Sequence, residues 1–354
     1  MRKKRIITIT GIRPDFIRMS EIFKKLDTHF EHILIHTGQH YDSLLSDVFF
    51  DELEIRMPDY NLGIGGPGKE HFYQSAELSI KSIELIRKEN LNPDLILFLG
   101  DSNSALASVP LKKEGYTIGH IEAGMRSGDK RMLEEINRTV CDACSDFLFV
   151  YHDNYKNKLQ KENITKNVYV VGNTIVEVVN KFKPVIDKKL DRIILDIHRP
   201  ENFKYKSRLE NIIQYATEMG ELHKLPVYLL GFKRTLEKIK EFDIKLENIQ
   251  VINLLPFKKY INEVYNSKFI ISDSGTAQEE PAILGTPVIV PRDFTERPES
   301  VESHCSFMLD VNSNSNETWP KSIAWLNSNP KIDTKWLGSG NTSDEVIKIL
   351  KNNL

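Results

Sequence analysis

The sequence predicts an α/β fold of two Rossmann-like, doubly wound domains. Short apolar and β-branched runs alternate with helix-like segments along the chain, a pattern that favours parallel sheets covered by helices. The chain has 354 residues, which is more than one hydrophobic core usually organises and fits two domains of roughly 150 to 200 residues. We expect an N-terminal domain over residues 1–175, a C-terminal domain over 176–335 and a final helical segment over 336–354.

Eleven segments have the composition of buried strands. The N-terminal domain holds six of them: RIITITG, FEHILIHTG, DLILFLGD, YTIGHIEAG, DFLFVYH and NVYVVGN. The C-terminal domain holds the other five: RIILDIH, LPVYLLG, IQVINLLP, KFIISDSG and TPVIVPRD. A Lys-rich link near residues 170–190 separates the sets, and TSDEVIKILKNNL predicts a terminal helix capped by Thr342 or Ser343.

Composition and charge exclude several classes of protein. A net charge of −2 gives no overall attraction to nucleic acid or to a membrane surface. No apolar run approaches the length of about 20 residues that a membrane span requires. The start, MRKKRIITITG, is interpreted as a first strand rather than a signal peptide. Three cysteines do not make a disulfide framework, so Cys141 and Cys144 are assigned structural roles and we expect a cytoplasmic protein.

Polar and charged residues stand where the predicted strands end. Ligands of open α/β sheets bind at the carboxyl ends of the strands, so two such domains facing each other would place these residues in one central cleft. A carboxylate at such a position is costly to bury unless it is partnered or used. Examples are Asp101, Glu122 and the pair His198–Arg199.

Two strand-to-helix junctions suggest anion sites. GIRPDFIRM offers backbone N–H groups at a helix start together with Arg13 and Arg18. In SDSGTAQEEPAILGTPVIVPRDFTERPES, Ser274 and Gly275 are expected to follow a strand and open a helix, where a hydroxyl and an amide can hold a phosphate. Glu279 or Glu280 could accept hydrogen bonds from ribose hydroxyls, and Arg297 adds a charge. The segment predicts a nucleotide diphosphate site.

Other cofactor motifs are missing. GIGGPGKEH follows no strand and lacks the GxGxxG spacing, so it is interpreted as a loop. There is no P-loop and no cluster with zinc-ligand spacing. No metal and no cofactor are therefore expected.

These segments together resemble the non-hydrolysing UDP-N-acetylglucosamine 2-epimerase family over nearly the whole chain. The family motifs occur in order as GIRPD, TGQH, GDSNSALA, HIEAGMRSG, EEINR, VVGNT, HRPENF, SDSGTAQEE and TERPE. The resemblance implies a GT-B type fold, with the C-terminal helix packing back on the first domain. It also implies a UDP-sugar substrate, a homodimer, and inversion of carbon 2 by elimination of UDP to a 2-acetamidoglycal and re-addition.

The resemblance assigns roles to individual positions. The catalytic residues it implies are Asp101, Glu122, Glu134 and His198. The UDP-sugar-binding residues it implies are Arg13, Arg18, Arg138, Asn173, Arg199, Glu201, Phe257, Ser274, Gly275, Glu280 and Arg297. A possible second substrate site would use Gln39 and His40.

Two departures from the family pattern bear on substrate and regulation. The loop MRSGDKRMLEE is slightly shorter than in the UDP-N-acetylglucosamine enzymes and has Leu133 where a proline is usual. These features are closer to relatives that act on modified sugars, namely UDP-diacetamido-glucuronate 2-epimerases and those forming UDP-N-acetyl-L-fucosamine or UDP-N-acetyl-L-rhamnosamine. LPVYLLGFKRT also lacks the histidine that binds a second, activating substrate molecule in bacterial members, so weakened or absent activation is expected.

The main alternative is a GT-B glycosyltransferase with a UDP-sugar donor. It would use the same nucleotide site but would have little need for three carboxylates around carbon 2. A hydrolysing relative or a silent nucleotide-sugar sensor fits less well, because every catalytic motif is retained.

Overall fold

The computed structural model describes residues 2–39, 47–66, 70–129, 132, 134–312 and 317–354. The chain divides into two compact units, each described here by itself. The N-terminal unit comprises residues 1–178 and 337–354, and the C-terminal unit comprises residues 179–336. In the described part of the chain, no helix is long and apolar enough to cross a membrane.

The N-terminal unit is built on a seven-stranded parallel sheet in the order β3-β2-β1-β4-β5-β6-β7. Its strands are β1 (Arg5–Thr10), β2 (Glu31–His36), β3 (Tyr60–Asn61), β4 (Leu95–Leu99), β5 (Ile118–Ile121), β6 (Phe147–Val150) and β7 (Val168–Val170). Its helices are α1 (Arg13–His29), α2 (Asp47–Leu53), α3 (His71–Lys88), η1 (Asn103–Ala107), α4 (Ser108–Lys113), α5 (Glu134–Cys144), α6 (Asp153–Lys161), α7 (Ile175–Phe182, which runs into the next unit), η3 (Lys335–Leu337, which returns from it) and α15 (Thr342–Asn353).

The C-terminal unit repeats this plan with a six-stranded parallel sheet in the order β10-β9-β8-β11-β12-β13. Its strands are β8 (Arg192–Asp196), β9 (Val227–Leu230), β10 (Ile249–Ile252), β11 (Ser267–Ser272), β12 (Val288–Val290) and β13 (Ser306–Met308). Its helices are α8 (Pro200–Phe203), α9 (Lys206–His223), α10 (Lys233–Glu241), α11 (Phe257–Asn266), η2 (Thr276–Gln278), α12 (Glu280–Leu284), α13 (Pro298–Glu302) and α14 (Thr318–Asn327).

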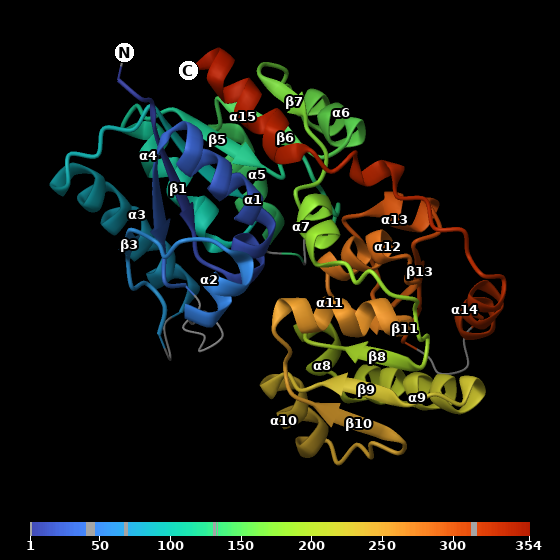
Figure 1. The fold of residues 1–354 in the computed structure, drawn as a ribbon. Helices are drawn as coiled ribbons and strands as arrows, with labels where there is room; N and C mark the ends of the chain where they lie inside the picture. Colours follow the sequence, from blue (N-terminus) through green and yellow to red (C-terminus); the bar gives the residue numbers. More distant parts are fainter. Residues whose placement is uncertain (1, 40–46, 67–69, 130–131, 133, 313–316) are drawn as a thin grey trace. The chain divides into compact units, whose positions relative to one another are not determined.

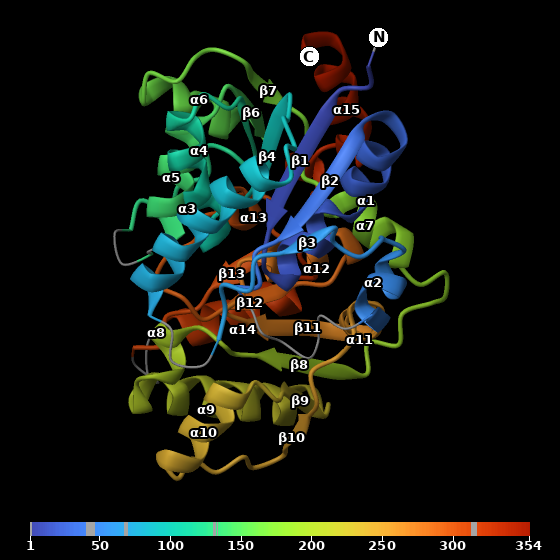
Figure 2. The same cartoon turned by 90° about the vertical axis from the view of Figure 1, so that its left-hand side faces the viewer.

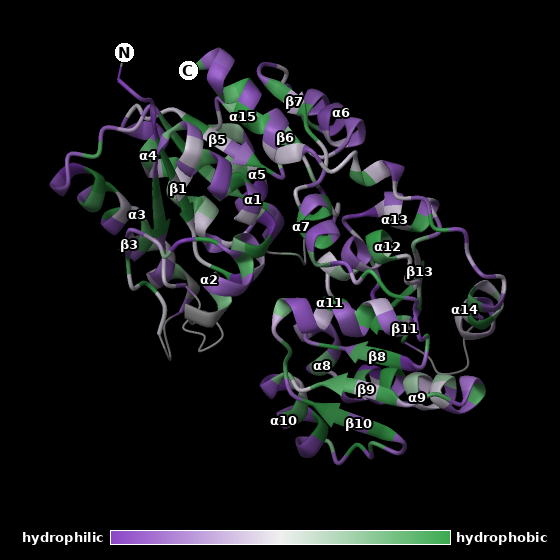
Figure 3. Ribbon diagram, in the orientation of Figure 1, coloured by the Kyte–Doolittle hydropathy of each residue, from purple (hydrophilic) through white to green (hydrophobic). Residues whose placement is uncertain are grey.

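Apolar strands covered by helices form the core of each unit. β4 reads LILFL and is buried along its whole length, as expected for a central parallel strand. Strands β8 and β9 are likewise mainly hydrophobic (Figure 3). The fold confirms the predicted α/β class and the parallel, doubly wound sheets.

The terminal helix α15 belongs to the N-terminal unit, where it lies beside α1 (Figures 1 and 2). Its Val346, Ile347 and Leu350 are buried. The residue before the helix, Asn341, occupies the N-cap position rather than Thr342 or Ser343. Ser343 instead donates from its backbone N–H (2.7 Å) and its hydroxyl (2.5 Å) to the Glu177 carboxylate on α7.

Candidate active site

Both sheets reverse their strand order at their first strand. The reversal lies between β1 and β4 in the N-terminal unit and between β8 and β11 in the C-terminal unit. Ligands of doubly wound sheets bind at the carboxyl ends of the strands at such a point. The predicted residues Asp101, Glu122, His198 and Ser274 follow β4, β5, β8 and β11 within three residues. Each unit therefore has a group of candidate residues at the carboxyl ends of its own strands.

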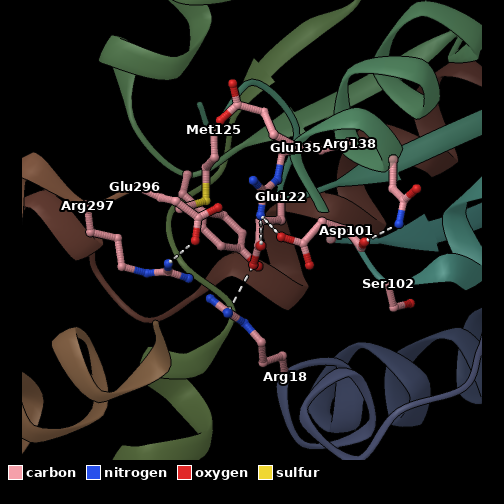
Figure 4. A network of polar contacts seen from close by, with 12 residues as sticks. Arg18, Asp101, Ser102, Glu122, Met125, Glu135, Arg138, Glu296 and Arg297 are labelled. Carbon is pink, nitrogen blue, oxygen red and sulfur yellow. Dashed lines mark hydrogen bonds and ion pairs between the residues drawn. The ribbon is translucent and has the colours of Figure 1, made fainter. Parts of the chain in front are cut away.

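In the N-terminal unit, Arg138 joins two of the predicted catalytic carboxylates. Its Nη2 pairs with Asp101 Oδ2 and lies 3.1 Å from Glu122 Oε1. Arg18 on α1 reaches the other oxygen of Glu122, with 3.0 Å between Nη1 and Oε2 (Figure 4). Glu122 is 4% exposed and Arg138 1%. Two cations around one buried carboxylate favour its ionised form.

A further carboxyl group, Asp15, is buried and was missed by the sequence analysis. It lies in the first turn of α1, and its Oδ2 accepts hydrogen bonds from the hydroxyls of Thr10 (3.0 Å) and Ser102 (3.2 Å). Burial raises the pKa of Asp15 well above its ordinary value, and the negative charges of Asp101 and Glu122 raise it further against the two hydroxyl groups. Burial and the two neighbouring carboxylates therefore favour the protonated form of Asp15.

The start of α5 supplies the remaining acidic residues. Glu134 opens the helix one turn before Arg138. Glu135 holds the preceding loop, because its Oε2 accepts the backbone N–H groups of Ser127 (2.5 Å) and Gly128 (3.2 Å). Asn137 donates to the Asp101 carbonyl at 2.9 Å. Helix α5 thus holds both the Asp101 backbone and, through Arg138, its carboxylate.

Three other predicted residues of the N-terminal unit, Asn173, Arg13 and Gln39, each contact a neighbouring residue. Asn173 is 1% exposed and accepts from Arg18 Nη2 at 3.4 Å. Arg13 lies over the Phe49 ring, 5.5 Å from its centroid. Of the possible second site, Gln39 bonds through its backbone N–H to the Thr37 hydroxyl at 3.3 Å, whereas His40 lies outside the described residues.

In the C-terminal unit, two aspartates that sequence reasoning did not single out hold His198. Its Nδ1 lies 3.0 Å from Asp196 Oδ1. Asp273 accepts the backbone N–H groups of His198 (3.0 Å) and Arg199 (3.1 Å). Burial alone would lower the pKa of His198, but Asp196 and Asp273 raise it above its ordinary value. The two aspartates therefore favour the protonated, proton-donating form of His198.

Two arginines converge on the turn after β11. A methyl group added to Gly275 would lie 3.0 Å from Arg297 Nη1 and 3.7 Å from Arg199 Nη2. The Ser274 hydroxyl lies 3.2 Å from that of Thr276. Hydroxyls, backbone and two guanidinium groups around a glycine suit an oxyanion. The predicted helix start is corrected: the turn leads into the three-residue η2, and α12 begins only at Glu280.

Arg297 is positioned by acidic partners of its own. Glu279 accepts from its Nε at 2.6 Å, and Glu296 lies 3.2 Å from its Nη1 (Figure 4). Because Glu279 pairs with Arg297, Glu280 is the better candidate of the two for a ribose contact. The predicted Glu201 lies 3.3 Å from Arg292. Phe257 is 2% exposed and packs edge-on against Phe182, with 5.6 Å between the ring centroids.

The doubly wound sheets and these two groups of residues define a GT-B type enzyme of nucleotide-sugar chemistry. The sequence model of the UDP-N-acetylglucosamine 2-epimerase family matches residues 24–351. The chain belongs to this family and is an isomerase.

Relatives cover almost the whole chain. A UDP-N-acetylglucosamine 2-epimerase homolog of Methanococcus maripaludis is 35% identical over 98% of this chain and 99% of its own. The UDP-2,3-diacetamido-2,3-dideoxy-D-glucuronate 2-epimerase of Pseudomonas aeruginosa is 36% identical over 84% of this chain and 86% of its own. The crystal structure of Methanocaldococcus jannaschii UDP-GlcNAc 2-epimerase with UDP-GlcNAc and UDP has a TM-score of 0.86 and 31% identity, and the match covers 99% of this chain and 100% of that one.

Proposed function

We propose that the chain inverts carbon 2 of a UDP-linked acetamido sugar without hydrolysing it. Carbon 2 has no neighbouring carbonyl group to acidify its proton, so simple deprotonation is too costly. Breaking the carbon 1–oxygen bond to UDP while the carbon 2 proton leaves gives a neutral 2-acetamidoglycal. Re-addition of UDP at carbon 1, with protonation of carbon 2 on the opposite face, gives the epimer. The observation that carries this proposal is the cluster of Asp101 with the buried Arg138 and Glu122 in a chain of this family.

The reaction needs one group that takes a proton and one that delivers it. Asp101, Glu122, Glu134 and His198 are the proposed acid–base set. Arg138 and Arg18 favour the ionised, proton-accepting form of Glu122, whereas Asp196 and Asp273 raise the pKa of His198 and so favour its proton-donating form. General acid–base catalysis of this kind contributes about 10²–10⁴-fold in rate.

The departing diphosphate must be held so that it can add back. The proposed contacts are Ser274, Gly275, Arg199 and Arg297 for the phosphates, Glu280 for the ribose and Phe257 for the uracil side. Arg13, Arg18, Arg138, Asn173 and Glu201 complete the proposed UDP-sugar-binding set. The convergence of Arg199 and Arg297 on Gly275 supports this assignment. Donors fixed before the reaction stabilise the developing charge on UDP at the least cost.

The substrate proposed is UDP-N-acetylglucosamine or a modified or 6-deoxy UDP-acetamido sugar, including the substrates that yield UDP-N-acetyl-L-fucosamine or UDP-N-acetyl-L-rhamnosamine. The M. jannaschii structure contains UDP-GlcNAc, and the P. aeruginosa relative is named for a diacetamido glucuronate. The short MRSGDKRMLEE loop favours the modified sugars. We further propose a homodimer that serves surface polysaccharide or glycan synthesis.

Proton NMR in D₂O tests the reaction and the substrate together. The protein is incubated, without added metal or NAD, with UDP-N-acetylglucosamine, a UDP-linked 6-deoxy acetamido sugar or a UDP-diacetamido-glucuronate. Loss of the H2 signal and appearance of the 2-epimer in one tube are expected. Intact UDP-sugar in every tube until an acceptor is added would overturn the proposal in favour of the glycosyltransferase.

A further inference from the structure

A buried histidine–aspartate pair lies behind the carboxylates of the N-terminal unit. His120 on β5 is 0% exposed, and Asp142 on α5 is 1% exposed. The two are joined by 2.7 Å between Nδ1 and Oδ1. The other ring nitrogen, Nε2, lies 2.8 Å from the carbonyl oxygen of Gly100. Asp142 Oδ2 accepts the backbone N–H of Gly124 at 3.1 Å and pairs with Arg126 Nη2 at 2.8 Å.

These contacts fix the protonation of the ring. A carbonyl oxygen can only accept, so Nε2 carries a proton and donates it to Gly100. Asp142 receives a backbone N–H and a guanidinium group on its other oxygen, which favours its ionised form, so Nδ1 also donates. Burial alone would lower the pKa of His120, but Cys141 and Asp142 raise it well above its ordinary value. Burial would raise the pKa of Asp142, but His120 and Arg126 hold it below its ordinary value.

The His120–Asp142 pair forms hydrogen bonds to the backbone next to each of two candidate catalytic residues, at Gly100 before Asp101 and at Gly124 after Glu122. Gly100 directly precedes Asp101 and has a φ of +65°, and its carbonyl belongs to the peptide group that carries the Asp101 nitrogen. Gly124 follows Glu122 by two residues. Glu122 itself has a φ of +70°, a left-handed conformation that a side chain adopts only when its surroundings impose it.

The regular pairing of β5 with β6 is also interrupted at the carboxyl end of β5. The backbone N–H groups of Glu122 (3.1 Å) and Ala123 (3.2 Å) both donate to the Phe149 carbonyl on β6, so two successive residues share one acceptor. Regular pairing therefore ends at Glu122. The His120–Asp142 pair then connects the residues after this interruption to the end of β4 and to α5.

We propose that His120 and Asp142 are positioning residues, which hold the Asp101 and Glu122 backbones in the geometry that carbon 2 chemistry requires. Neither residue touches the substrate; His120 acts through Gly100, and Asp142 acts through Gly124. This inference rests on the proposed function, because it assigns purpose to the placement of those two carboxylates. A displacement of about 1 Å at reacting groups can cost ~10²-fold in rate.

Two substitutions of His120 separate positioning from packing. His120→Gln places an amide near the former Nε2 and keeps a donor for Gly100, whereas His120→Asn keeps a donor only toward Asp142. We expect His120→Asn to lower kcat about 10²-fold with KM for the UDP-sugar nearly unchanged. His120→Gln should recover about tenfold of this loss, the effect of one hydrogen bond of ordinary strength.

His32→Asn is the matched control. His32 forms a 2.6 Å contact with Asp27 and has a buried side chain. It lies near the start of β2, beside α1, and therefore away from the carboxyl ends of the strands, where the candidate residues lie. This control should lower the melting temperature and leave kcat unchanged. Equal kcat in the two His120 variants, a loss confined to KM, or an equal kcat loss in His32→Asn would each overturn the proposal.

A measurement without substrate separates this proposal from the function itself. In protein labelled with ¹⁵N-histidine, we expect a ring that carries protons on both nitrogens at neutral pH and whose signal is absent from His120→Asn. Wild-type protein that shows this ring but exchanges no sugar proton would refute the proposed function alone. A singly protonated His120 ring at neutral pH would refute the ion pair and the positioning proposal.

Discussion

Arg138 illustrates at the residue scale how one side chain can hold two acids. Its guanidinium group contacts both Asp101 and Glu122 while almost completely buried. Both contacts come from one nitrogen, Nη2, which the rigid planar guanidinium group holds between the two carboxylates, whereas a lysine ends in an ammonium on a shorter, flexible stem. The arginine is therefore needed for its shape as well as for its charge.

Replacing Arg138 by lysine tests this requirement. One carboxylate should lose its charge-assisted hydrogen bond, at a cost of about 1.5–3 kcal/mol in the free energy of unfolding. The urea midpoint should fall with an unchanged slope, and epimerisation should slow. Arg87→Lys, which alters an exposed pair with Glu114, is the control and should leave both nearly unchanged. A stable, fully active Arg138→Lys protein would contradict this account.

Asp15 gives a pH dependence with a defined sign. Its pKa is raised in the folded protein, so the folded state binds more protons than the unfolded state above about pH 4, the ordinary pKa of an aspartate. This group therefore lowers stability as the pH rises, by up to ~1.4 kcal/mol per pH unit until its folded pKa is reached.

Asp15→Asn should remove that contribution. The stability of the variant relative to wild type should increase from pH 4 toward pH 8 in denaturation curves measured at each pH. The Asn side chain still offers an oxygen to Thr10 and Ser102. A stability difference that is constant across this range would show that Asp15 titrates normally.

The individual acids could be predicted from the sequence where they follow a strand directly. Asp101 lies two residues after the end of β4, and Glu122 directly follows β5. The strand pattern alone therefore indicated that both lie at strand ends. Asp15 escaped this rule because it lies in the first turn of α1, and Asp273 was not singled out, although it directly follows β11, because its importance lies in its contacts. Asp15 meets Ser102 across 87 positions of the chain, and Asp273 meets His198 across 75. No local pattern encodes such pairings.

At the scale of elements, the turn after β5 is fitted closely against α6. Gly124 has a φ of +78°, and an added Cβ would lie 2.7 Å from the Tyr155 carbonyl oxygen and 3.0 Å from Leu159 Cγ. Gly128 has a similar φ of +73° but nothing within 4 Å. The two glycines differ in their surroundings and not in their backbone conformation.

The corresponding alanine variants should separate these effects. Gly128→Ala should cost ~1–2 kcal/mol, the penalty of a left-handed alanine. Gly124→Ala should cost more, because a backbone carbonyl must also move, and it should reduce kcat by displacing the turn after Glu122. Thermal unfolding and initial rates check both. Equal effects of the two substitutions would contradict the contact with α6.

The strands were predictable where an apolar, β-branched run marks them. All eleven predicted segments contain strands, whereas β3 (Tyr60–Asn61) and β13 (Ser306–Met308) were missed. β3 has only two residues, and β13 is as long as the predicted β7 and β12 but reads SFM and lacks their β-branched residues. The prediction of a helix beginning at Gly275 was wrong. A 3₁₀ turn, η2, comes first, and α12 begins only at Glu280, with Pro281 in its first turn.

At the scale of the whole molecule, the kinetics should reveal whether a second substrate site operates. The segment between Pro226 and Thr235, formed by β9 and the start of α10, contains no histidine. We expect initial rates to follow a simple hyperbola in UDP-sugar concentration. A clearly sigmoidal curve would show that activation persists. Substituting Gln39 would then test whether that residue takes part.

The path of the chain has a consequence for synthesis. The C-terminal unit is one continuous stretch, residues 179–336, inserted into a unit assembled from residues 1–178 and 337–354. Domains generally fold as units while the chain emerges at about 5–20 residues per second. On the ribosome, the inserted unit is complete before the unit that began first. The apolar face of α1 that receives α15 therefore stays uncovered until α15 has emerged, so the nascent N-terminal half exposes an apolar surface for longer than the inserted unit does.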